Sequence, residues 1–285
     1  CKPCDVRAFI ELAKRNQVRR DNLFLVGLNC SGTFHPALAE QMIREGFGEN
    51  PLDLAGEEVE ADKLVIALKD GRTREKGLDE LAEQGFEMRE NCLRCSCRIP
   101  RMADIACGKW GNGGDAATFI EICSSKGHEF FDAAVRGGAL AVKAAAKVHI
   151  EEREQAEARA VEKAQLREKK DLGALQAYAP ADRLKFWVEH LERCIKCFGC
   201  RDACPICFCR ECYLEPYRDC IPGGETPPDI MFQLVRLSHV ADSCVNCGQC
   251  QDACPMEIPL TRLYNYLNKE LQDIFEYRPG MDGDA

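Results

Sequence analysis

Two cysteine runs with the same spacing constrain this chain more than any other feature of its sequence. Each run has three cysteines separated by two residues, then a fourth cysteine after three more residues, followed by proline. Three thiolates in a tight loop can ligate three irons of a cubane 4Fe-4S cluster, and the fourth cysteine lies where the chain leads away. The runs consist of Cys194, Cys197, Cys200, Cys204 and Pro205, and of Cys244, Cys247, Cys250, Cys254 and Pro255.

The spacing is that of two-cluster ferredoxins, in which the fourth cysteine of each run ligates the cluster of the other run. Zinc knuckles are the alternative, because structural zinc sites also use cysteine pairs two residues apart. Zinc requires neither the third cysteine nor the final proline-flanked one, so the spacing favours clusters. The predicted sets are Cys194, Cys197, Cys200 and Cys254 for one cluster, and Cys244, Cys247, Cys250 and Cys204 for the other.

Length, charge and cysteine usage narrow the class of protein. A chain of 285 residues is expected to form one or two domains. The net charge of −9 and the pI of about 5.3 argue against a nucleic-acid partner. Neither a run of 18 apolar residues nor a signal peptide is recognisable, so we expect no membrane span. Twenty cysteines would suit a disulfide scaffold in a secreted chain, but cluster ligation needs reduced thiolates, which predicts a cytoplasmic location.

The first 138 residues alternate between candidate strands and helices, which predicts an α/β domain. Cys30 directly follows the first apolar run, at the position where open α/β sheets place their ligands. Asp5 is the expected N-cap of the first helix. The predicted strands are residues 23–28, 63–68 and 118–123, and the predicted helices are residues 5–17, 36–45, 78–84 and 129–136.

A further cysteine pair, Cys92 and Cys95, precedes a segment rich in glycine. Glycine lets backbone N–H groups approach a phosphate or a flat ring closely. A surface turn accounts for such a segment equally well. The sequence by itself therefore leaves a ligand cradle and a plain turn open. The glycines are Gly108, Gly111, Gly113 and Gly114.

Four blocks in this region resemble, in the same order, the C-terminal region of the beta subunits of coenzyme F420-reducing hydrogenases and formate dehydrogenases. They are Pro3-Cys4-Asp5 before a helix, Gly27-Leu-Asn-Cys30-Ser-Gly32 after a strand, Cys92-Leu-Arg-Cys95 before Ala103-Asp104-Ile105-Ala-Cys-Gly108, and the segment from Gly111 to Thr118. The chain begins inside the first block, so we expect the N-terminal portion of this domain, which helps complete the flavin pocket in the family, to be missing.

The resemblance implies a 4Fe-4S cluster next to an FAD. Buried or free thiols are the other interpretation of the first cysteines. The family has no cysteine at Cys1, Cys97 or Cys107, and either Cys1 or Cys97 could replace one of the expected ligands. The implied ligands are Cys4, Cys30, Cys92 and Cys95, and the implied flavin-binding residues are Asp104, Gly108, Gly111, Asn112, Gly113 and Gly114.

Residues 139–182 are predicted to form a helical connector. Ala, Glu, Lys and Arg, which are good helix formers, dominate the segment, and no glycine or proline occurs from residue 139 to 172. We expect Val142, Ala146 and Ile150 to pack on the first domain, and the polar remainder to form a solvated bridge that Gly173 and Pro180 end.

Residues 183–285 are predicted to form a ferredoxin-type iron-sulfur domain with helices at 229–240 and 260–277. The expected fold class is therefore α+β, with an α/β flavin and cluster domain at 1–138 before the connector. Four more cysteines lie between the two runs, and a third cluster, a zinc site and idle thiols are all open for them. They are Cys207, Cys209, Cys212 and Cys220.

These motifs and the resemblance together imply an electron-transferring beta subunit of an oxidoreductase complex. Clusters carry single electrons, whereas a flavin stores two and exchanges a hydride. The resemblance implies coenzyme F420 as the hydride carrier and the catalytic subunit of a formate dehydrogenase or a nickel-iron hydrogenase as the partner. The C-terminal module favours formate dehydrogenase, and the sequence indicates no catalytic residue. The alternatives are a flavin-free polyferredoxin-like relay, in a hydrogenase or heterodisulfide reductase complex, and a zinc-bound scaffold.

Overall fold

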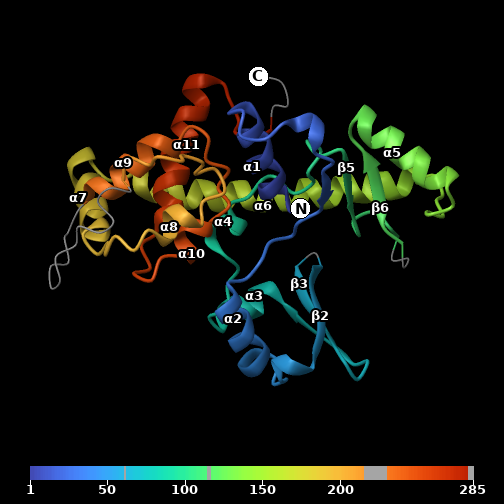
Figure 1. The fold of residues 1–285 in the computed structure, drawn as a ribbon. Helices are drawn as coiled ribbons and strands as arrows, with labels where there is room; N and C mark the ends of the chain where they lie inside the picture. Colours follow the sequence, from blue (N-terminus) through green and yellow to red (C-terminus); the bar gives the residue numbers. More distant parts are fainter. Residues whose placement is uncertain (61, 114–116, 215–229, 282–285) are drawn as a thin grey trace.

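The computed structural model describes residues 1–60, 62–113, 117–214 and 230–281 and combines helices with two small sheets (Figure 1). Buried apolar side chains form three clusters in this part of the chain. The predicted α+β class is confirmed at the level of mixed helices and sheets. The expected α/β domain is not a regular parallel sheet, since β1 and β5 form the one parallel strand pair of the described residues.

The first sheet has the strand order β1-β5-β6, with β1 (Val26–Leu28) parallel to β5 (Ile105–Gly108) and β5 antiparallel to β6 (Phe119–Ile122). Helix α1 (Pro3–Lys14) packs beside it through Val6 and Ile10, with Leu25 and Ala103 in the same cluster. Helix α5 (Ser125–Arg136) follows β6, and a short 3-10 helix (Arg20–Asn22) precedes β1. Asp5 is not the N-cap of α1. Lys2 takes that position, and the Asp5 carboxylate accepts the Lys2 backbone N–H at 2.9 Å.

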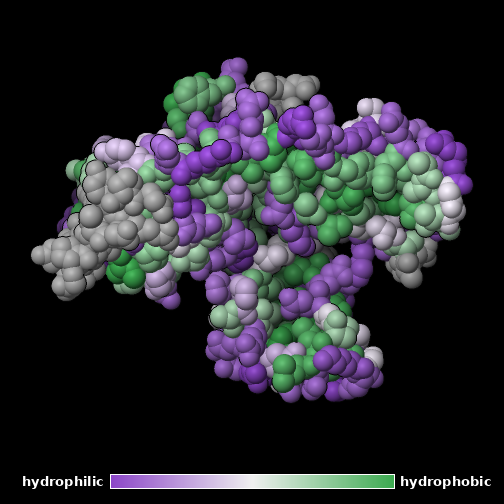
Figure 2. All heavy atoms as spheres, in the orientation of Figure 1, coloured by the Kyte–Doolittle hydropathy of each residue, from purple (hydrophilic) through white to green (hydrophobic). Residues whose placement is uncertain are grey.

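The second sheet belongs to a lobe that projects from the rest of the molecule (Figures 1 and 2). It is antiparallel, with the order β2 (Leu54–Glu60), β3 (Lys63–Leu68) and β4 (Thr73–Gly77). β3 was predicted with these bounds, and its alternate residues Leu64, Ile66 and Leu68 form the core of the lobe. The charged strands β2 and β4 escaped prediction because they lack an apolar run. The lobe also contains helix α2 (Pro36–Gln41), a short π-helix (Met42–Gly46), a 3-10 helix (Pro51–Asp53) and helix α3 (Leu78–Glu83).

Helix α6 (Lys147–Gln176) runs along the body of the molecule from the side of β6 to the side of α7 (Figure 1). The expected apolar stripe is wrong, because Val142 is 48% and Ile150 42% exposed. Gly173 does not end the helix but lies within it. The helix is not a solvated bridge either, because Arg153, Ala164 and Leu175 are buried. Its charged side chains also pair with residues outside the helix. These pairs are Lys163 with Asp62, Arg167 with Glu87, and Lys269 with Glu168.

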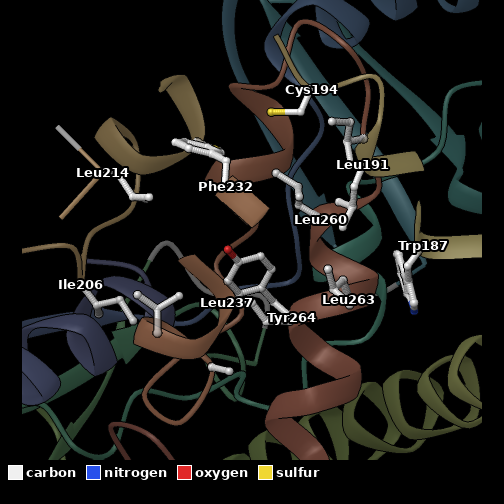
Figure 3. Close-up of a cluster of buried hydrophobic side chains, with 14 of the residues drawn as sticks. Trp187, Leu191, Cys194, Ile206, Leu214, Phe232, Leu237, Leu260, Leu263 and Tyr264 are labelled. Carbon is white, nitrogen blue, oxygen red and sulfur yellow. The ribbon is translucent and has the colours of Figure 1, made fainter. Parts of the chain in front are cut away.

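Most of the remaining helices surround the two cysteine runs and share a large apolar core (Figure 3). Trp187, Phe232 and Tyr264 are buried there, together with Ala8 of α1 and Leu175 of α6. Within the described ranges, every helix is too short or too polar to cross a lipid bilayer. The helices are α4 (Glu90–Leu93), α7 (Pro180–Leu191), α8 (Gly199–Asp202), α9 (Ile230–Val240), α10 (Gln249–Asp252) and α11 (Leu260–Phe275).

Candidate metal centres and an adjoining cleft

The two cysteine runs fold into loops of the same local shape. In each loop the residue before the second cysteine and the residue after it have left-handed backbones. These are Lys196 (φ 51°) and Phe198 (φ 62°) in the first loop, and Asn246 (φ 53°) and Gly248 (φ 81°) in the second. A short helix, α8 or α10, then carries the third cysteine. The repeated spacing therefore corresponds to a repeated backbone.

Each loop borders a small cavity that also receives the fourth cysteine of the other loop. Residues of the first cavity include Phe198, Phe232 and Gln233, and residues of the second include Arg236, Thr261 and Tyr264. This is the crossed arrangement that the spacing predicts, although iron ligation itself stays a prediction. The cysteines are Cys194, Cys197, Cys200 and Cys254 at the first cavity, and Cys244, Cys247, Cys250 and Cys204 at the second.

The surroundings of these thiols suit a group that brings positive charge. Burial raises the pKa of Cys244 to about 12 and that of Cys247 to about 11, because a thiolate without a counter-charge is poorly solvated there. Iron supplies that charge, and metal binding removes the thiol protons. The donor set therefore fits iron-sulfur clusters.

Two polar residues of α9 complete these surroundings, and sequence reasoning missed both. Gln233 Nε2 lies 3.6 Å from Sγ of both Cys194 and Cys200. The Arg236 guanidinium is buried, borders the second cavity and donates to Tyr264 Oη at 2.9 Å. The sequence did carry a signal for them, because a polar and a cationic residue rarely lie on the buried face of an apolar helix without a partner.

The four N-terminal cysteines implied by the resemblance are neighbours in the structure. They come from α1, from the loop after β1 and from α4 with the turn that follows it. Burial raises the pKa of Cys4 to about 12, with smaller contributions from charges that include Cys247, Cys95 and Cys30. Burial also raises the pKa of Cys30, to which Cys92 and Cys95 contribute. The Cys4 site therefore adjoins the second cysteine loop.

The extra N-terminal cysteines have identifiable surroundings. Cys97 is buried, and its backbone oxygen lies 3.4 Å from Cys95 Sγ. Cys1 is exposed and extends the first sheet, since its carbonyl accepts the Leu28 N–H at 2.8 Å. Cys107 lies on β5, with its Sγ 3.5 Å from the Gly27 carbonyl oxygen. Cys97 therefore contacts the predicted ligand Cys95 through its backbone.

The cysteines between the two runs are only partly described. The thiols of Cys204 and Cys207 hydrogen-bond, which lowers the pKa of Cys204 and raises that of Cys207. Cys209 is exposed, and Cys220 lies outside the described residues. Among the residues that the structure describes, no three Cys, His, Asp or Glu side chains are close enough to hold a single metal ion. A third site in this segment stays a prediction.

A cleft of about 1260 Å³ lies beside the Cys4 site, at the carboxyl ends of the parallel strands β1 and β5. One wall is the loop on both sides of Cys30, and the opposite wall is β2 of the lobe. Such strand ends are where α/β sheets usually bind ligands. The lining includes Lys2, Asn29, Gly32, Phe34, Glu58, Gly108, Lys109, Trp110 and Asn112.

The predicted flavin residues divide into two groups. Gly108 and Asn112 line the cleft, but Asp104, Gly111 and Gly113 do not. The buried Asp104 carboxylate accepts hydrogen bonds from the Leu25 N–H at 2.7 Å and Ser124 Oγ at 2.8 Å, and it pairs with Arg20. Arg20 and these donors lower the pKa of Asp104 although burial opposes the shift. Asp104 therefore joins segments of the fold, and its role in flavin binding stays a prediction.

Gly111 and Gly113 allow helix α6 to pack closely against their loop. Both have left-handed backbones, with φ of 82° and 68°. A Cβ atom at Gly111 would overlap the His149 carbonyl oxygen, and one at Gly113 would come within 2.8 Å of His149 Nε2. These glycines are thus explained by packing, and Gly114 lies outside the described residues.

Comparison with known proteins decides the family. A family model described as the C terminus of the beta subunit of coenzyme F420 hydrogenase/dehydrogenase matches residues 1–148. The chain belongs to this family. The resemblance drawn from the cysteine motifs is therefore confirmed, and so is the expectation that the chain is a subunit of an oxidoreductase.

Two curated relatives match along the whole chain. The F420-dependent formate dehydrogenase subunit beta of Methanocaldococcus jannaschii is 44% identical over 283 residues, covering 99% of this chain and 73% of the relative. The F420-dependent formate dehydrogenase 1 subunit beta of Methanococcus maripaludis is 43% identical over 288 residues, covering 100% of this chain and 73% of the relative. Both matches thus extend over the C-terminal part of the chain as well as the part that the family model covers.

A solved structure also has a similar fold over part of the chain. A chain from the xenon-derivatised F420-reducing [NiFe] hydrogenase complex of Methanosarcina barkeri aligns with a TM-score of 0.52. The match covers 60% of each chain at 17% sequence identity, so it shows a shared fold and nothing finer.

Proposed function

We propose that this protein is the electron-transferring beta subunit of a coenzyme F420-dependent formate dehydrogenase, with 4Fe-4S clusters and an FAD. The single observation that carries this proposal is the succession of candidate sites. The first-loop site has the exposed Cys197, the second-loop site adjoins it through the crossed cysteines, and the Cys4 site adjoins the second loop. The cleft then begins at the loop that carries Cys30.

Each part has a distinct chemical task in this proposal. When bound, the clusters would carry one electron at a time, and the flavin would exchange a hydride with coenzyme F420. The three sets of cysteines would hold clusters, and Cys207, Cys209, Cys212 and Cys220 would hold a fourth cluster. In the cleft, Lys2 and Lys109 could pair with the FAD phosphates. Oxidation of formate would take place on the catalytic partner subunit, where electrons could enter through the exposed Cys197 edge.

The first test is an anaerobic count of iron, sulfide, zinc and flavin per chain. About sixteen irons with one FAD would support four clusters and a flavin. About eight to twelve irons without flavin would instead support the polyferredoxin-like relay. Zinc in place of iron would contradict the electron-transfer proposal.

A charge reversal tests the cleft separately. Lys109→Glu is expected to weaken FAD binding, because it replaces a cation of the cleft with a carboxylate close to Glu58, the present ion-pair partner of Lys109. Lys63→Glu is the matched control, since Lys63 on β3 of the lobe also pairs with a glutamate, Glu75, but does not line the cleft. Equal FAD dissociation constants for the two variants, measured by flavin fluorescence, would contradict the assignment of the cleft.

A further inference from the structure

A buried side chain of α4 connects the Cys4 site with the second cysteine loop. Asn91 lies on α4, next to Cys92, and is 8% exposed. Its Nδ2 donates to the Cys247 carbonyl oxygen at 2.8 Å and lies 3.4 Å from the Asn246 carbonyl oxygen. The same nitrogen lies 3.7 Å from Cys92 Sγ. One amide group therefore contacts a predicted ligand of each of two clusters.

The second cysteine loop is shaped to receive this amide. Gly248 follows Cys247 with a φ of 81°, and a Cβ atom there would overlap the Asn91 carboxamide. The first loop has no such requirement, since Phe198 occupies the equivalent position. The glycine thus permits the close approach of α4 to the loop.

A second route between these two sites runs through Arg89 and is longer. Arg89 Nη2 donates to the Cys247 carbonyl oxygen at 3.1 Å, and its Nη1 lies 3.4 Å from Thr33 Oγ1. Thr33 Oγ1 lies in turn 3.5 Å from Cys92 Sγ. This route needs three successive contacts, whereas the route through Asn91 needs two that share one nitrogen.

We propose that Asn91 is a positioning residue that connects the two sites for electron transfer and sets how an electron is shared between them. The inference rests on the proposed function, because both sites must hold clusters. In the step concerned, one electron leaves the cluster held by the second loop and one arrives at the cluster held by Cys4, Cys30, Cys92 and Cys95. No bond forms or breaks, and no proton moves.

The direction of the effect follows from the hydrogen bond to sulfur. An N–H donated to a ligand sulfur stabilises the more negative, reduced state, so it raises the reduction potential of that cluster. Without the Asn91 amide, the Cys92 site should hold the shared electron less often. The transfer should also be slower, because the hydrogen-bonded route through Asn91 is lost.

Asn91→Leu is the principal variant, because leucine has a similar size but no donor. The expected result is a fall of about tenfold in the ratio of electrons on the N-terminal site to electrons on the second-loop site, which corresponds to about 1.4 kcal/mol. Redox titration followed by electron paramagnetic resonance measures this ratio, and rapid freeze-quench after partial reduction measures the transfer rate. Cys30→Ser identifies the signal of the N-terminal site.

Arg262→Gln is the matched control. Arg262 on α11 pairs with Glu90 beside Asn91, so this variant removes a neighbouring contact of α4 without touching a cysteine. An altered ratio in Asn91→Leu but not in Arg262→Gln supports the proposal. The proposal is wrong if both variants shift the ratio equally, or if neither does.

Asn91→Asp keeps the test decisive if leucine prevents folding. Its carboxylate would face the Cys247 carbonyl oxygen and Cys92 Sγ, so the ratio should fall further than in the leucine variant. An unchanged ratio in a variant with full iron content would overturn the role of Asn91. Absence of clusters from the unaltered protein would instead show that the proposed function itself fails.

Discussion

The two cysteine loops have the same spacing and the same left-handed backbone positions, yet they pack against different parts of the molecule. In the first loop Phe198 is buried, and its ring lies 5.0 Å from that of Phe232 on α9. In the second loop Gly248 takes the equivalent position, and Asn91 of the N-terminal part occupies the space of a side chain. Cluster spacing thus constrains the backbone of a loop but leaves its neighbours to the rest of the fold.

The difference also shows two ways of tolerating a left-handed residue. Outside glycine this conformation costs roughly 1–2 kcal/mol. At Phe198 the burial of an aromatic ring offsets the strain. At Gly248 the absence of a Cβ atom removes both the strain and a clash with Asn91.

The largest effect is expected where the two loops exchange their fourth cysteines. Cys254→Ser should remove the cluster of the first loop, and Cys204→Ser that of the second, each with a loss of about four irons per chain. Iron content and electron paramagnetic resonance measure the loss. Cys194→Ser and Cys244→Ser identify the signal of each loop. The crossed arrangement is wrong if Cys254→Ser resembles Cys244→Ser.

The next effect tests the aromatic packing of the first loop. Phe198→Ala should lower the free energy of unfolding by about 3–5 kcal/mol, because it leaves a cavity beside Phe232. Anaerobic urea unfolding measures the change. Ile195→Ala in the same loop serves as the control, since Ile195 is 36% exposed and should change stability by less than about 1 kcal/mol. Similar losses in both variants would argue against a special role of the ring.

A smaller effect tests the glycine of the second loop. Gly248→Ala should destabilise the protein by about 2–4 kcal/mol, combining the left-handed strain with the clash at Asn91. Gly71→Ala separates the two causes, because Gly71 has a φ of 89° with open space around it and should lose only about 1–2 kcal/mol. If the two alanine variants unfold at the same urea concentration, contact with Asn91 is not important for stability.

The smallest effect concerns the ion pair that holds α4 against α11. Arg262 lowers the pKa of the Glu90 carboxyl although burial opposes the shift. A carboxyl group whose pKa is lowered in the folded protein stabilises the fold at every pH above its pKa in the unfolded chain, which is about 4.3. This stabilisation is lost only as the pH falls below that value. Glu90→Gln should therefore cost about 1 kcal/mol, since water still reaches the pair. The difference from the unaltered protein in thermal unfolding should stay constant between about pH 8 and pH 6. A difference that shrinks across this range would contradict the lowered pKa.

Sequence patterns predicted those elements whose formation depends on residues close together in the sequence. Apolar alternation predicted β3 with its bounds, and the positions of several helices followed from their periodicity. The same patterns missed elements whose structure depends on contacts with residues far away in the sequence. β2 and β4 are charged edge strands that exist because β3 pairs with them. Helix α6 is mostly charged, yet it lies against the body, where Arg153, Ala164 and Leu175 are buried, and no composition reveals these positions.

The candidate site divides in the same way. The cysteine spacing alone indicated both loops, since a cluster demands thiols at short, regular intervals and a backbone that turns between them. The resemblance named the four N-terminal cysteines, which the structure brings together from separate elements. Asp104 and Gly111 belong to motifs of the expected flavin site, but contacts with Arg20 and His149 account for them.

The sequence by itself determined the cysteine loops, their crossed pairing as an expectation and the family of the chain. Tertiary structure decided which loop meets the N-terminal cysteines, where the cleft opens and why the two equivalent positions carry phenylalanine and glycine. The physical reason is the separation along the chain between the residues that interact. Ligand spacing and backbone turns are properties of adjacent residues, whereas the contact of Asn91 with Cys247 joins residues 156 positions apart and exists only after the chain has folded.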